Sequence, residues 1–393
     1  MGEVRVGIIG IGNMGSAHAA CIGDGKIRGM KLTCVCDCRI PRLQMVQERY
    51  PSVAVFTDYK DMYASGLVDA VVIAVPHRLH AQMAVDALES GLHVLVEKPV
   101  DVSVSQARRL NEAAEKSDRV FGIMFNQRTN QLFQKARELV QSGQLGELKR
   151  CVWIVTNWYR TQHYYDSGSW RATWAGEGGG VLLNQAPHNL DLWQWICGMP
   201  VSVTAFCDVA KYHRIEVEDD VTIAARYANG ATGLFITSTG EYPGTNRLEV
   251  AGSRGKLVLE NGVLKWWKLA ESEREYCFSA ENNSGKIETE YQEFTQTQKE
   301  AAHAGILQNF TNAILFGEKL IAPGEEGIYE LMISNAAYLS QWNGNRAVNL
   351  PFEEAQFDEL LAKLAETSAV IDRDCEEKSS CERGYRERWQ VQW

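Results

Sequence analysis

The sequence lacks a hydrophobic run long enough to cross a membrane and also lacks a surplus of basic residues. No apolar stretch in its 393 residues approaches the roughly 20 residues that span a bilayer, so no transmembrane helix is expected. Asp and Glu number 50 against 40 Lys and Arg, whereas a protein that binds the nucleic-acid backbone needs an excess of Lys and Arg. We therefore expect neither a membrane nor a nucleic acid as a partner.

No export signal is expected, because a strand-like run begins at Val4 and leaves no room for the apolar part of a signal peptide. The ten cysteines are then expected to be reduced thiols in a cytoplasmic protein. Cys34, Cys36 and Cys38 alternate along one predicted strand, which places them on one face. Since no second cluster accompanies them, we interpret them as core residues and expect no metal site.

The length of the chain suggests two domains, and 45% hydrophobic with 23% charged residues is ordinary globular composition. In residues 1–125, short apolar runs alternate with helical patterns, as in a parallel sheet covered by helices on both faces. The predicted strands are Val4–Ile9, Leu32–Cys36, Ala70–Val75, His93–Val96 and Val120–Phe125, and the predicted helices are Met14–Cys21, Arg42–Arg49, His80–Ser90 and Ser105–Lys116. We predict a Rossmann-type, doubly wound α/β domain over residues 1–125.

Residues 126–366 predict a second, α+β domain with a large, mostly antiparallel open sheet. The strands are expected at Lys149–Tyr159, Val201–Val209, Val221–Tyr227, Ala231–Ser238, Asn246–Gly252, Lys256–Glu260 and Leu264–Leu269, and the helices at Gln131–Ser142, Gln185–Ile196, Ala301–Phe316 and Glu325–Trp342. These helices can cover only part of the sheet, so we expect a homodimer or homotetramer formed through it. Residues 367–393 are a polar extension, either a frayed terminus or an arm that bridges subunits.

A glycine-rich turn follows the first strand and opens the first helix. Its residues are Gly10, Ile11, Gly12, Asn13, Met14 and Gly15, a G-x-G-x-x-G sequence in the strand–turn–helix context that dinucleotide binding requires. Asp37 closes the second strand, where a carboxylate accepts the ribose hydroxyls and repels a 2′-phosphate. NAD is therefore the expected cofactor, and NADP stays open because Arg39 can accommodate a phosphate.

Two further segments carry candidate catalytic residues. Glu97-Lys98-Pro99 ends the fourth strand, at the sheet edge where ligands bind, and a lysine of lowered pKa there can accept a hydroxyl proton. Gly178–Asp191 contains a glycine run, interpreted as a flexible lead into a helix that carries Asn184 and His188 on one face. His188 is a natural proton shuttle, and Asp191 can orient its imidazole or cap the structure.

Aromatic residues are concentrated between residues 151 and 195, where nine of 45 residues are Trp or Tyr. Rings interleaved with arginines suit a polyol that has apolar C–H faces and many hydroxyls. We expect Tyr159, Trp170 and Arg171 to bind the substrate. For any single ring, a place in the sheet core or at a subunit interface is the simpler explanation.

These motifs together resemble the Gfo/Idh/MocA oxidoreductase family. The resemblance rests on the glycine turn, Asp37, Ala74–His80, Glu97-Lys98-Pro99 and the glycine run followed by Asn184 and His188, in the family's order. It implies a Rossmann domain, NAD(P) dependence and sugar or cyclitol substrates, with Lys98 and His188 as catalytic residues. It further implies contacts of Pro76, His77, His80, Glu97, Lys98 and Asn126 with the cofactor, and of Arg128 with the substrate.

The sequence departs from the family pattern at Asn184, where many members carry Asp. An amide cannot act as a base, so Asn184 is expected only to form hydrogen bonds with the substrate. We predict an NAD-dependent dehydrogenase that moves hydride between a secondary hydroxyl of a sugar, glycoside or cyclitol and nicotinamide C4. One alternative is a glycoside-cleaving enzyme that oxidises, eliminates and re-reduces with no net redox change. Another is a cofactor-sensing regulator without activity.

Overall fold

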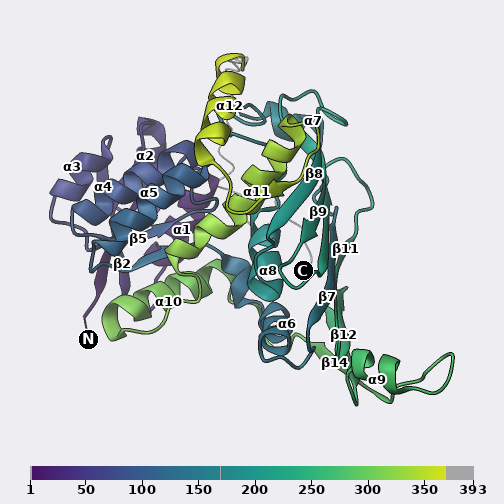
Figure 1. Cartoon of the computed structure of the whole chain (residues 1–393). Coiled ribbons are helices and arrows are strands. Elements are labelled where there is room, and N and C mark those ends of the chain that lie inside the picture. The colour runs from purple at the N-terminus through teal and green to yellow at the C-terminus, as the bar shows by residue number, and fades with distance from the viewer. Residues whose placement is uncertain (1, 169, 369–393) are drawn as a thin grey trace.

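The computed structural model describes residues 2–168 and 170–368, so of the predicted C-terminal extension only Thr367 and Ser368 fall inside the described part. Within these ranges no helix is long and apolar enough to cross a membrane. Two sheets form the two halves of the molecule, and helix α11 (Gly327–Trp342) runs between them (Figure 1). The α/β fold class predicted from the sequence is confirmed.

The first sheet is parallel throughout and has the strand order β3-β2-β1-β4-β5-β6. Its strands are β1 (Val4–Ile9), β2 (Met30–Cys36), β3 (Ala54–Phe56), β4 (Ala70–Ile73), β5 (His93–Val96) and β6 (Phe121–Ile123), and its helices are α1 (Asn13–Gly23), α2 (Ile40–Arg49), α3 (Tyr59–Ala64), α4 (His80–Glu89) and α5 (Val104–Glu115). All five predicted strands are present, because apolar runs such as β4 are buried on both faces. Cys38 lies beyond β2 and is exposed, so its assignment to the core was wrong.

The second sheet has nine strands in the order β14-β13-β12-β11-β7-β10-β9-β8-β15. They are β7 (Leu148–Val155), β8 (Ser202–Val209), β9 (Glu218–Arg226), β10 (Thr232–Ser238), β11 (Asn246–Gly252), β12 (Gly255–Glu260), β13 (Val263–Leu269), β14 (Thr289–Thr295) and β15 (Val348–Asn349). Only the central pair β7–β10 is parallel, and the other pairs are antiparallel. The predicted mostly antiparallel sheet is therefore confirmed.

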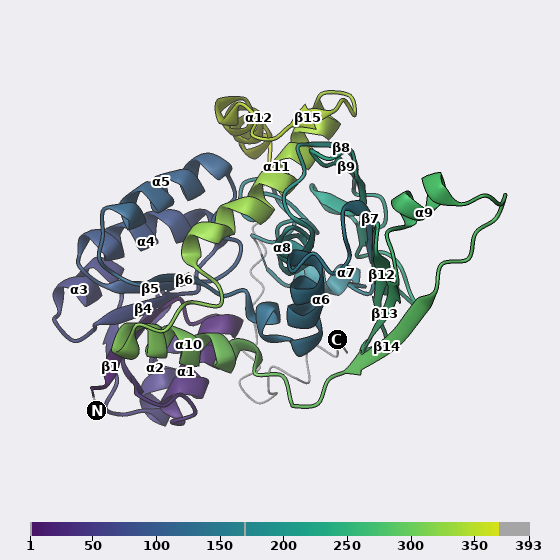
Figure 2. The same ribbon diagram turned by 60° about the horizontal axis from the view of Figure 1, so that its bottom comes forward.

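Helices cover one face of this sheet, the face turned toward the first sheet. They are α6 (Gln131–Gln141), α8 (Pro187–Cys197) and α11, and α11 also packs against α5. Helix α10 (Ala302–Phe316) returns to the first half of the molecule and packs against β1 (Figure 2). The remaining helices are α7 (Gln162–Asp166), α9 (Glu273–Ser279), α12 (Glu354–Glu366) and the 3-10 turns η1 (His77–Leu79), η2 (Asn126–Thr129) and η3 (Gly324–Glu326). A division of the chain near residue 125 stays a prediction.

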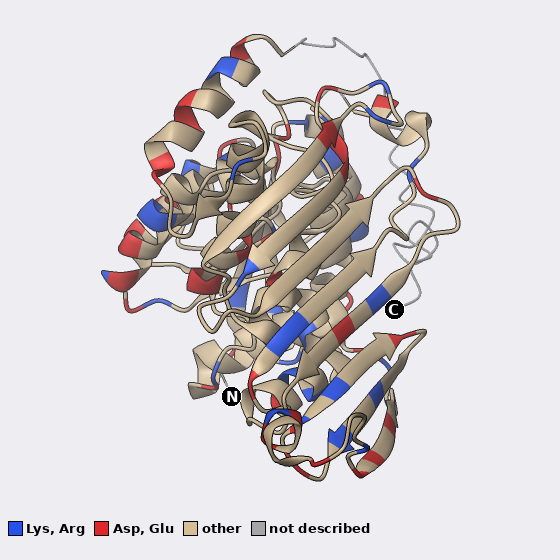
Figure 3. Cartoon of the chain, turned by 45° about the vertical axis from the view of Figure 1, so that its right-hand side comes forward, with Lys and Arg blue, Asp and Glu red and all other residues tan. Residues whose placement is uncertain are grey.

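In the part of the chain that the structure describes, no helix covers the other face of the nine-stranded sheet (Figure 3). Its central strands carry few charges, whereas charged side chains are concentrated toward β11–β14. Phe206 of β8, which is 55% exposed, and the partly buried Leu234 and Ile236 of β10 form an apolar strip on this face.

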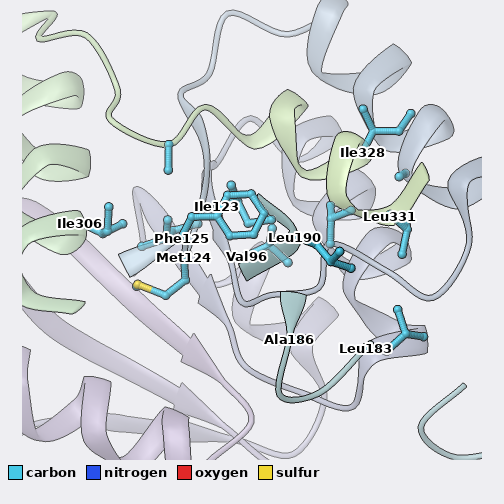
Figure 4. Close-up of a cluster of buried hydrophobic side chains, with 14 of the residues drawn as sticks. Val96, Ile123, Met124, Phe125, Leu183, Ala186, Leu190, Ile306, Ile328 and Leu331 are labelled. Carbon is cyan, nitrogen blue, oxygen red and sulfur yellow. The ribbon is translucent and has the colours of Figure 1, made fainter. Parts of the chain in front are cut away.

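A buried apolar cluster joins the two halves of the molecule (Figure 4). Val96 and Ile123 come from the first sheet, Leu183 and Leu190 from the segment around α8, and Leu331 from α11, and all are essentially inaccessible to solvent. Because these side chains pack together, the end of β5 and the start of α8 are held at fixed positions relative to each other. The candidate catalytic residues lie next to this cluster.

Candidate active site

The glycine turn after β1 has the shape that a dinucleotide needs. Gly10 has φ +86°, and a Cβ there would lie 2.4 Å from the carbonyl oxygen of Ala74. A Cβ on Gly15 would lie 1.7 Å from the carbonyl oxygen of Gly10, so helix and strand pack closely only without a side chain. Above Gly12 the nearest atom to such a Cβ is a guanidinium nitrogen of Arg42, 4.0 Å away. The space over Gly12, at the start of α1, therefore fits a cofactor pyrophosphate.

Asp37 lies beside this turn and is nearly buried. Its carboxylate accepts hydrogen bonds from the backbone N–H groups of Ile11, at 2.7 Å, and Arg39, at 2.8 Å. Arg42, on α2, lies 3.4 Å from the same carboxylate, whereas the side chain of Arg39 is exposed. The sequence analysis missed Arg42, although its place as the first residue of the predicted second helix, five residues after Asp37, is a signal. A carboxylate with these neighbours fits the ribose site of NAD.

Glu97 and Lys98, at the end of β5, differ in their partners. Glu97 is buried and pairs with His18 of α1 at 2.8 Å. Burial raises the pKa of Glu97, but the hydrogen bond from His18 and the positive charges of His18, His303 and Lys98 together outweigh burial, so the pKa falls to about 2. The amine of Lys98 instead donates a 2.7 Å hydrogen bond to the backbone carbonyl of Asn184. Burial lowers the pKa of Lys98, and the nearby carboxylates of Glu97, Glu330 and Glu177 act against that shift.

The segment that carries Asn184 and His188 differs from the prediction in two ways. Asn184 lies in a turn before the helix, because α8 begins at Pro187 and a proline fits only the first turn of a helix. The glycine run is not a flexible lead, since Gly178, Gly179 and Gly180 are all buried. A Cβ on Gly180 would lie 1.9 Å from the carbonyl oxygen of Glu218. Close packing, rather than flexibility, explains these glycines.

His188, at the start of α8, lies close enough to Lys98 for the charge of the amine to act on the imidazole. Burial and the positive charge of Lys98 hold the pKa of His188 well below its ordinary value, so the imidazole is neutral at pH 7. Its Nδ1 has no hydrogen-bond partner among the described residues. Asp191 does not orient this ring, because its carboxylate binds Arg128 at 2.6 Å. An unpartnered imidazole nitrogen beside a lysine is available to a ligand hydroxyl.

The residues expected beside the nicotinamide are placed as follows. Pro76 is exposed, and Asn126 is buried with a side-chain oxygen that has no partner among the described residues. The ring of His77 lies 5.8 Å from that of Trp170, centroid to centroid. His80 is buried, and its two ring nitrogens face the backbone carbonyls of Pro99 and Val75, at 2.7 and 2.8 Å. His80 therefore ties two loops together and leaves no polar atom for a cofactor.

Arg128 does not line the site, contrary to the sequence-based expectation. Its side chain is fully inaccessible, and its guanidinium pairs with Asp191 and with Glu326. The same guanidinium lies 5.1 Å from the ring of Phe125 and 5.2 Å from that of Trp195. All its donors face protein groups, so Arg128 fastens α8 to the loop before α11 rather than holding the substrate.

Tyr159, Trp170 and Arg171, the three residues expected to bind the substrate, pack mainly against other aromatic side chains. Tyr159 is 45% exposed, and its ring lies 5.6 Å from that of Tyr242. Arg171 lies 4.6 Å from the ring of Tyr164 and 4.9 Å from that of Trp170, and it also donates to the Tyr164 hydroxyl. Tyr159, Trp170 and Arg171 remain accessible to different degrees, and their contact with a substrate stays a prediction.

Glu177 was missed by the sequence analysis, although it directly precedes the glycine run. It is 2% exposed, and its carboxylate accepts hydrogen bonds from the side chain of Asn184 and from the backbone N–H of Ala172. No pattern in the sequence distinguishes this glutamate from a surface residue of a polar loop. Within residues 2–168 and 170–368, no group of three or more His, Cys, Asp or Glu side chains is arranged to hold a metal ion.

A dinucleotide-binding turn, a ribose-site carboxylate and a lysine–histidine pair at the sheet edge define an NAD-binding oxidoreductase. Residues 4–125 match the family described as "Oxidoreductase family, NAD-binding Rossmann fold", and residues 133–258 match "GFO/IDH/MocA C-terminal domain". The chain belongs to the Gfo/Idh/MocA family of oxidoreductases.

Curated relatives extend over nearly the whole chain. Myo-inositol 2-dehydrogenase from Thermotoga maritima is 24% identical over 340 residues, which cover 85% of this chain and 95% of that protein. Inositol 2-dehydrogenase from Rhizobium meliloti is 24% identical over 342 residues, which cover 86% of this chain and 96% of that protein. The similarity thus includes both sheets.

Among solved structures, the WlbA dehydrogenase from Bordetella pertussis in complex with NADH and UDP-GlcNAcA aligns with a TM-score of 0.74. It is 25% identical, and the alignment covers 89% of this chain and 100% of that one. A levoglucosan dehydrogenase in complex with NADH and levoglucosan has a TM-score of 0.71 at 20% identity, covering 89% of this chain and 100% of that one. The latter likeness concerns the fold alone.

Proposed function

We propose that this protein is an NAD-dependent dehydrogenase that oxidises a secondary hydroxyl of a sugar, glycoside or cyclitol. The observation that carries the proposal is the meeting of Lys98, from the first sheet, with Asn184 and His188, from the second half of the chain. The named activities of the relatives, on inositols, support the same class of substrate.

The cofactor would be held by the glycine turn at Gly10–Gly15, by Asp37 and by the groups at the ends of β4–β6, and it supplies the hydride acceptor. Asp37 supports NAD, since a carboxylate repels a 2′-phosphate. Arg42 lies 3.4 Å from the Asp37 carboxylate and Arg39 is two residues from Asp37 in the chain, so NADP is the second cofactor to test.

In the proposed reaction Lys98 takes the hydroxyl proton of the substrate. Its lowered pKa supports this role, because an amine accepts a proton only in its neutral form. His188, neutral and with Nδ1 unpartnered, is placed to exchange a hydrogen bond with the same hydroxyl. Asn184 cannot act as a base, and its amide is left to orient the substrate. Tyr159, Trp170 and Arg171 are proposed as the wall against which the substrate lies.

A panel of inositols, sugars and glycosides with NAD or NADP tests the proposal, with the absorbance of the reduced cofactor as the readout. We expect NADH to accumulate with at least one polyol or cyclitol. Release of an aglycone from a glycoside without accumulation of NADH would instead support the cleaving enzyme, which the relatives' names do not support. The absence of turnover with every member, despite NAD binding, would overturn the proposal.

We also propose a cytoplasmic homodimer or homotetramer that forms through the open face of the nine-stranded sheet. The apolar strip on that face and the free state of the eight described cysteines support this assignment. Light scattering during size-exclusion chromatography checks the assembly: a charge placed in the strip by Phe206→Glu should reduce the mass to that of one chain. An unchanged mass would place the interface elsewhere.

A further inference from the structure

Glu177 contacts Asn184, the residue at which this chain has an amide where many family members carry Asp. The amide nitrogen of Asn184 donates a hydrogen bond to one oxygen of the Glu177 carboxylate, and the N–H of Ala172 donates to the other at 2.6 Å. The backbone carbonyl of Glu177 also accepts a hydrogen bond from Nδ1 of His77 at 3.3 Å. Glu177 thus holds side chains from both halves of the molecule.

This arrangement fixes which atom of the Asn184 amide faces the site. A carboxylate has no hydrogen to donate, so it must receive the amide NH₂ group and cannot face the amide oxygen. The side-chain oxygen of Asn184 is therefore directed away from Glu177, and the side chain is partly accessible. Asn184 offers a hydrogen-bond acceptor of defined position to whatever enters the site.

A second acceptor lies next to the first. The amine of Lys98 is bound to the backbone of the same Asn184, and as a base it accepts the hydrogen of the hydroxyl that is oxidised. Two acceptors on adjoining groups suit two adjoining donors. On a polyol those donors are the reacting hydroxyl and the hydroxyl on a neighbouring carbon.

We propose, on the basis of the proposed function, that Glu177 is a positioning residue: it fixes the Asn184 amide so that its oxygen accepts a hydroxyl neighbouring the reacting one. The site then selects substrates with a vicinal pair of hydroxyls. The reacting hydroxyl gives its proton to Lys98, while the neighbouring hydroxyl keeps its proton and donates to Asn184.

Glu330 provides a matched control, since it is a second buried glutamate close enough to act on the pKa of Lys98. Neither oxygen of Glu330 has a hydrogen-bond partner among the described residues, and burial raises its pKa well above the ordinary value. Burial raises the pKa of Glu177 as well, but both of its oxygens accept hydrogen bonds from N–H groups, which act against that shift, whereas Glu330 has no such bonds in the part of the chain that the structure describes. Glu330→Gln therefore makes the same chemical change as Glu177→Gln, at a residue that has no hydrogen bond to Asn184.

Steady-state kinetics of four variants test the proposal with the best polyol of the panel. Glu177→Gln should lower kcat/KM about tenfold, as the loss of an orienting partner does, and leave the Kd of NAD unchanged. Asn184→Asp should cost more, about 100-fold, because two carboxylates would then be in contact. The double variant Asn184→Asp with Glu177→Gln should regain at least about tenfold over Asn184→Asp alone, since one carboxylate and one amide are restored. Glu330→Gln should stay within about threefold of the wild type.

Substrate analogues distinguish a positioning role of Glu177 from a purely structural one, because a structural role would not change the dependence of kcat/KM on the neighbouring hydroxyl. A substrate without the neighbouring hydroxyl should lose about tenfold or more in kcat/KM with the wild type and much less with Glu177→Gln. Equal losses in the two proteins, or a double variant no better than Asn184→Asp, would overturn the proposal.

Labelling of Lys98 by an acylating reagent, followed by mass spectrometry over a range of pH, separates this inference from the proposed function. Glu177→Gln and Glu330→Gln should both move the midpoint of labelling to lower pH, because both glutamates raise the pKa of Lys98. The other charged or titratable groups that act on Lys98 or are acted on by it are the same in all variants: Glu97, Arg160, His77, His80, His188 and His303. A wild type without turnover refutes the dehydrogenase, and an unmoved midpoint in Glu177→Gln refutes the role of Glu177 whatever the turnover.

Discussion

The amine of Lys98 lies 2.7 Å from the backbone carbonyl oxygen of Asn184, although 86 residues separate them in the chain. This contact joins the end of β5 to the turn before α8, so the candidate base and the candidate substrate-orienting residues are held as one unit. The buried cluster of Val96, Ile123 and Leu190 lies behind it and fixes the two segments. Geometry of this kind is what a reaction between cofactor and substrate requires.

Replacement of Lys98 by methionine tests the base directly. The variant keeps most of the side-chain volume but cannot accept a proton, so kcat should fall by about 10²–10⁴. The Kd of NAD, measured by quenching of tryptophan fluorescence, should change little. The exposed Lys116→Met is the matched control and should behave as the wild type. A kcat near that of the wild type for Lys98→Met would remove Lys98 from the mechanism.

The pH dependence of the two directions of the reaction follows from the lowered pKa of Lys98. Oxidation needs the neutral amine, so kcat/KM should rise with pH and level off below 10.5, the ordinary lysine value. Reduction of the ketone needs the protonated amine, so its kcat/KM should rise as the pH falls through the same pKa. Measurements of kcat/KM for oxidation and for reduction at a series of pH values check the direction of each change. If the change in kcat/KM had its midpoint at or above the ordinary lysine pKa, Lys98 would not be the group that accepts the proton.

The sequence predicted the fold well where a pattern reflects a local requirement. Gly10 and Gly15 are needed for close packing, and the buried strands are continuous apolar runs, so both could be read from the chain. Strand β3, by contrast, has three residues that are only partly buried, and it left no clear pattern.

The side-chain contacts of a residue were harder to predict from the sequence than its position in the fold. Arg128 follows the strand end as expected, but two carboxylates from distant segments, Asp191 and Glu326, enclose it. Glu177 owes its role to a turn that brings it back to Asn184, and neither residue alone reveals the other. Side-chain pairs of this kind depend on tertiary structure, which a local pattern does not contain.

Cofactor preference should respond to the charge of Asp37. Asp37→Asn keeps the shape but removes the negative charge, so the Kd of NAD should rise about tenfold and discrimination against NADP should shrink. Titrations of both cofactors measure the ratio. Arg39→Gln serves as the companion variant and should weaken NADP more than NAD. If Asp37→Asn leaves the ratio of the two Kd values unchanged, another group sets the preference.

The buried ion pair of Arg128 makes a prediction about stability rather than activity. Arg128→Met should lower the free energy of unfolding by about 3–5 kcal/mol, because it leaves the carboxylate of Asp191 buried without a cation. Denaturant titration checks the magnitude, and Arg128→Met with Asp191→Asn should recover part of the loss.

The direction in which this loss of unfolding free energy changes with pH also follows from the pKa of Asp191. Burial raises the pKa of Asp191, and removing Arg128 raises it further, so the folded variant binds a proton more tightly than the unfolded chain. The loss should therefore shrink as the pH falls toward that raised pKa, whereas a loss that grows in acid would show that Asp191 is not the group left unpaired.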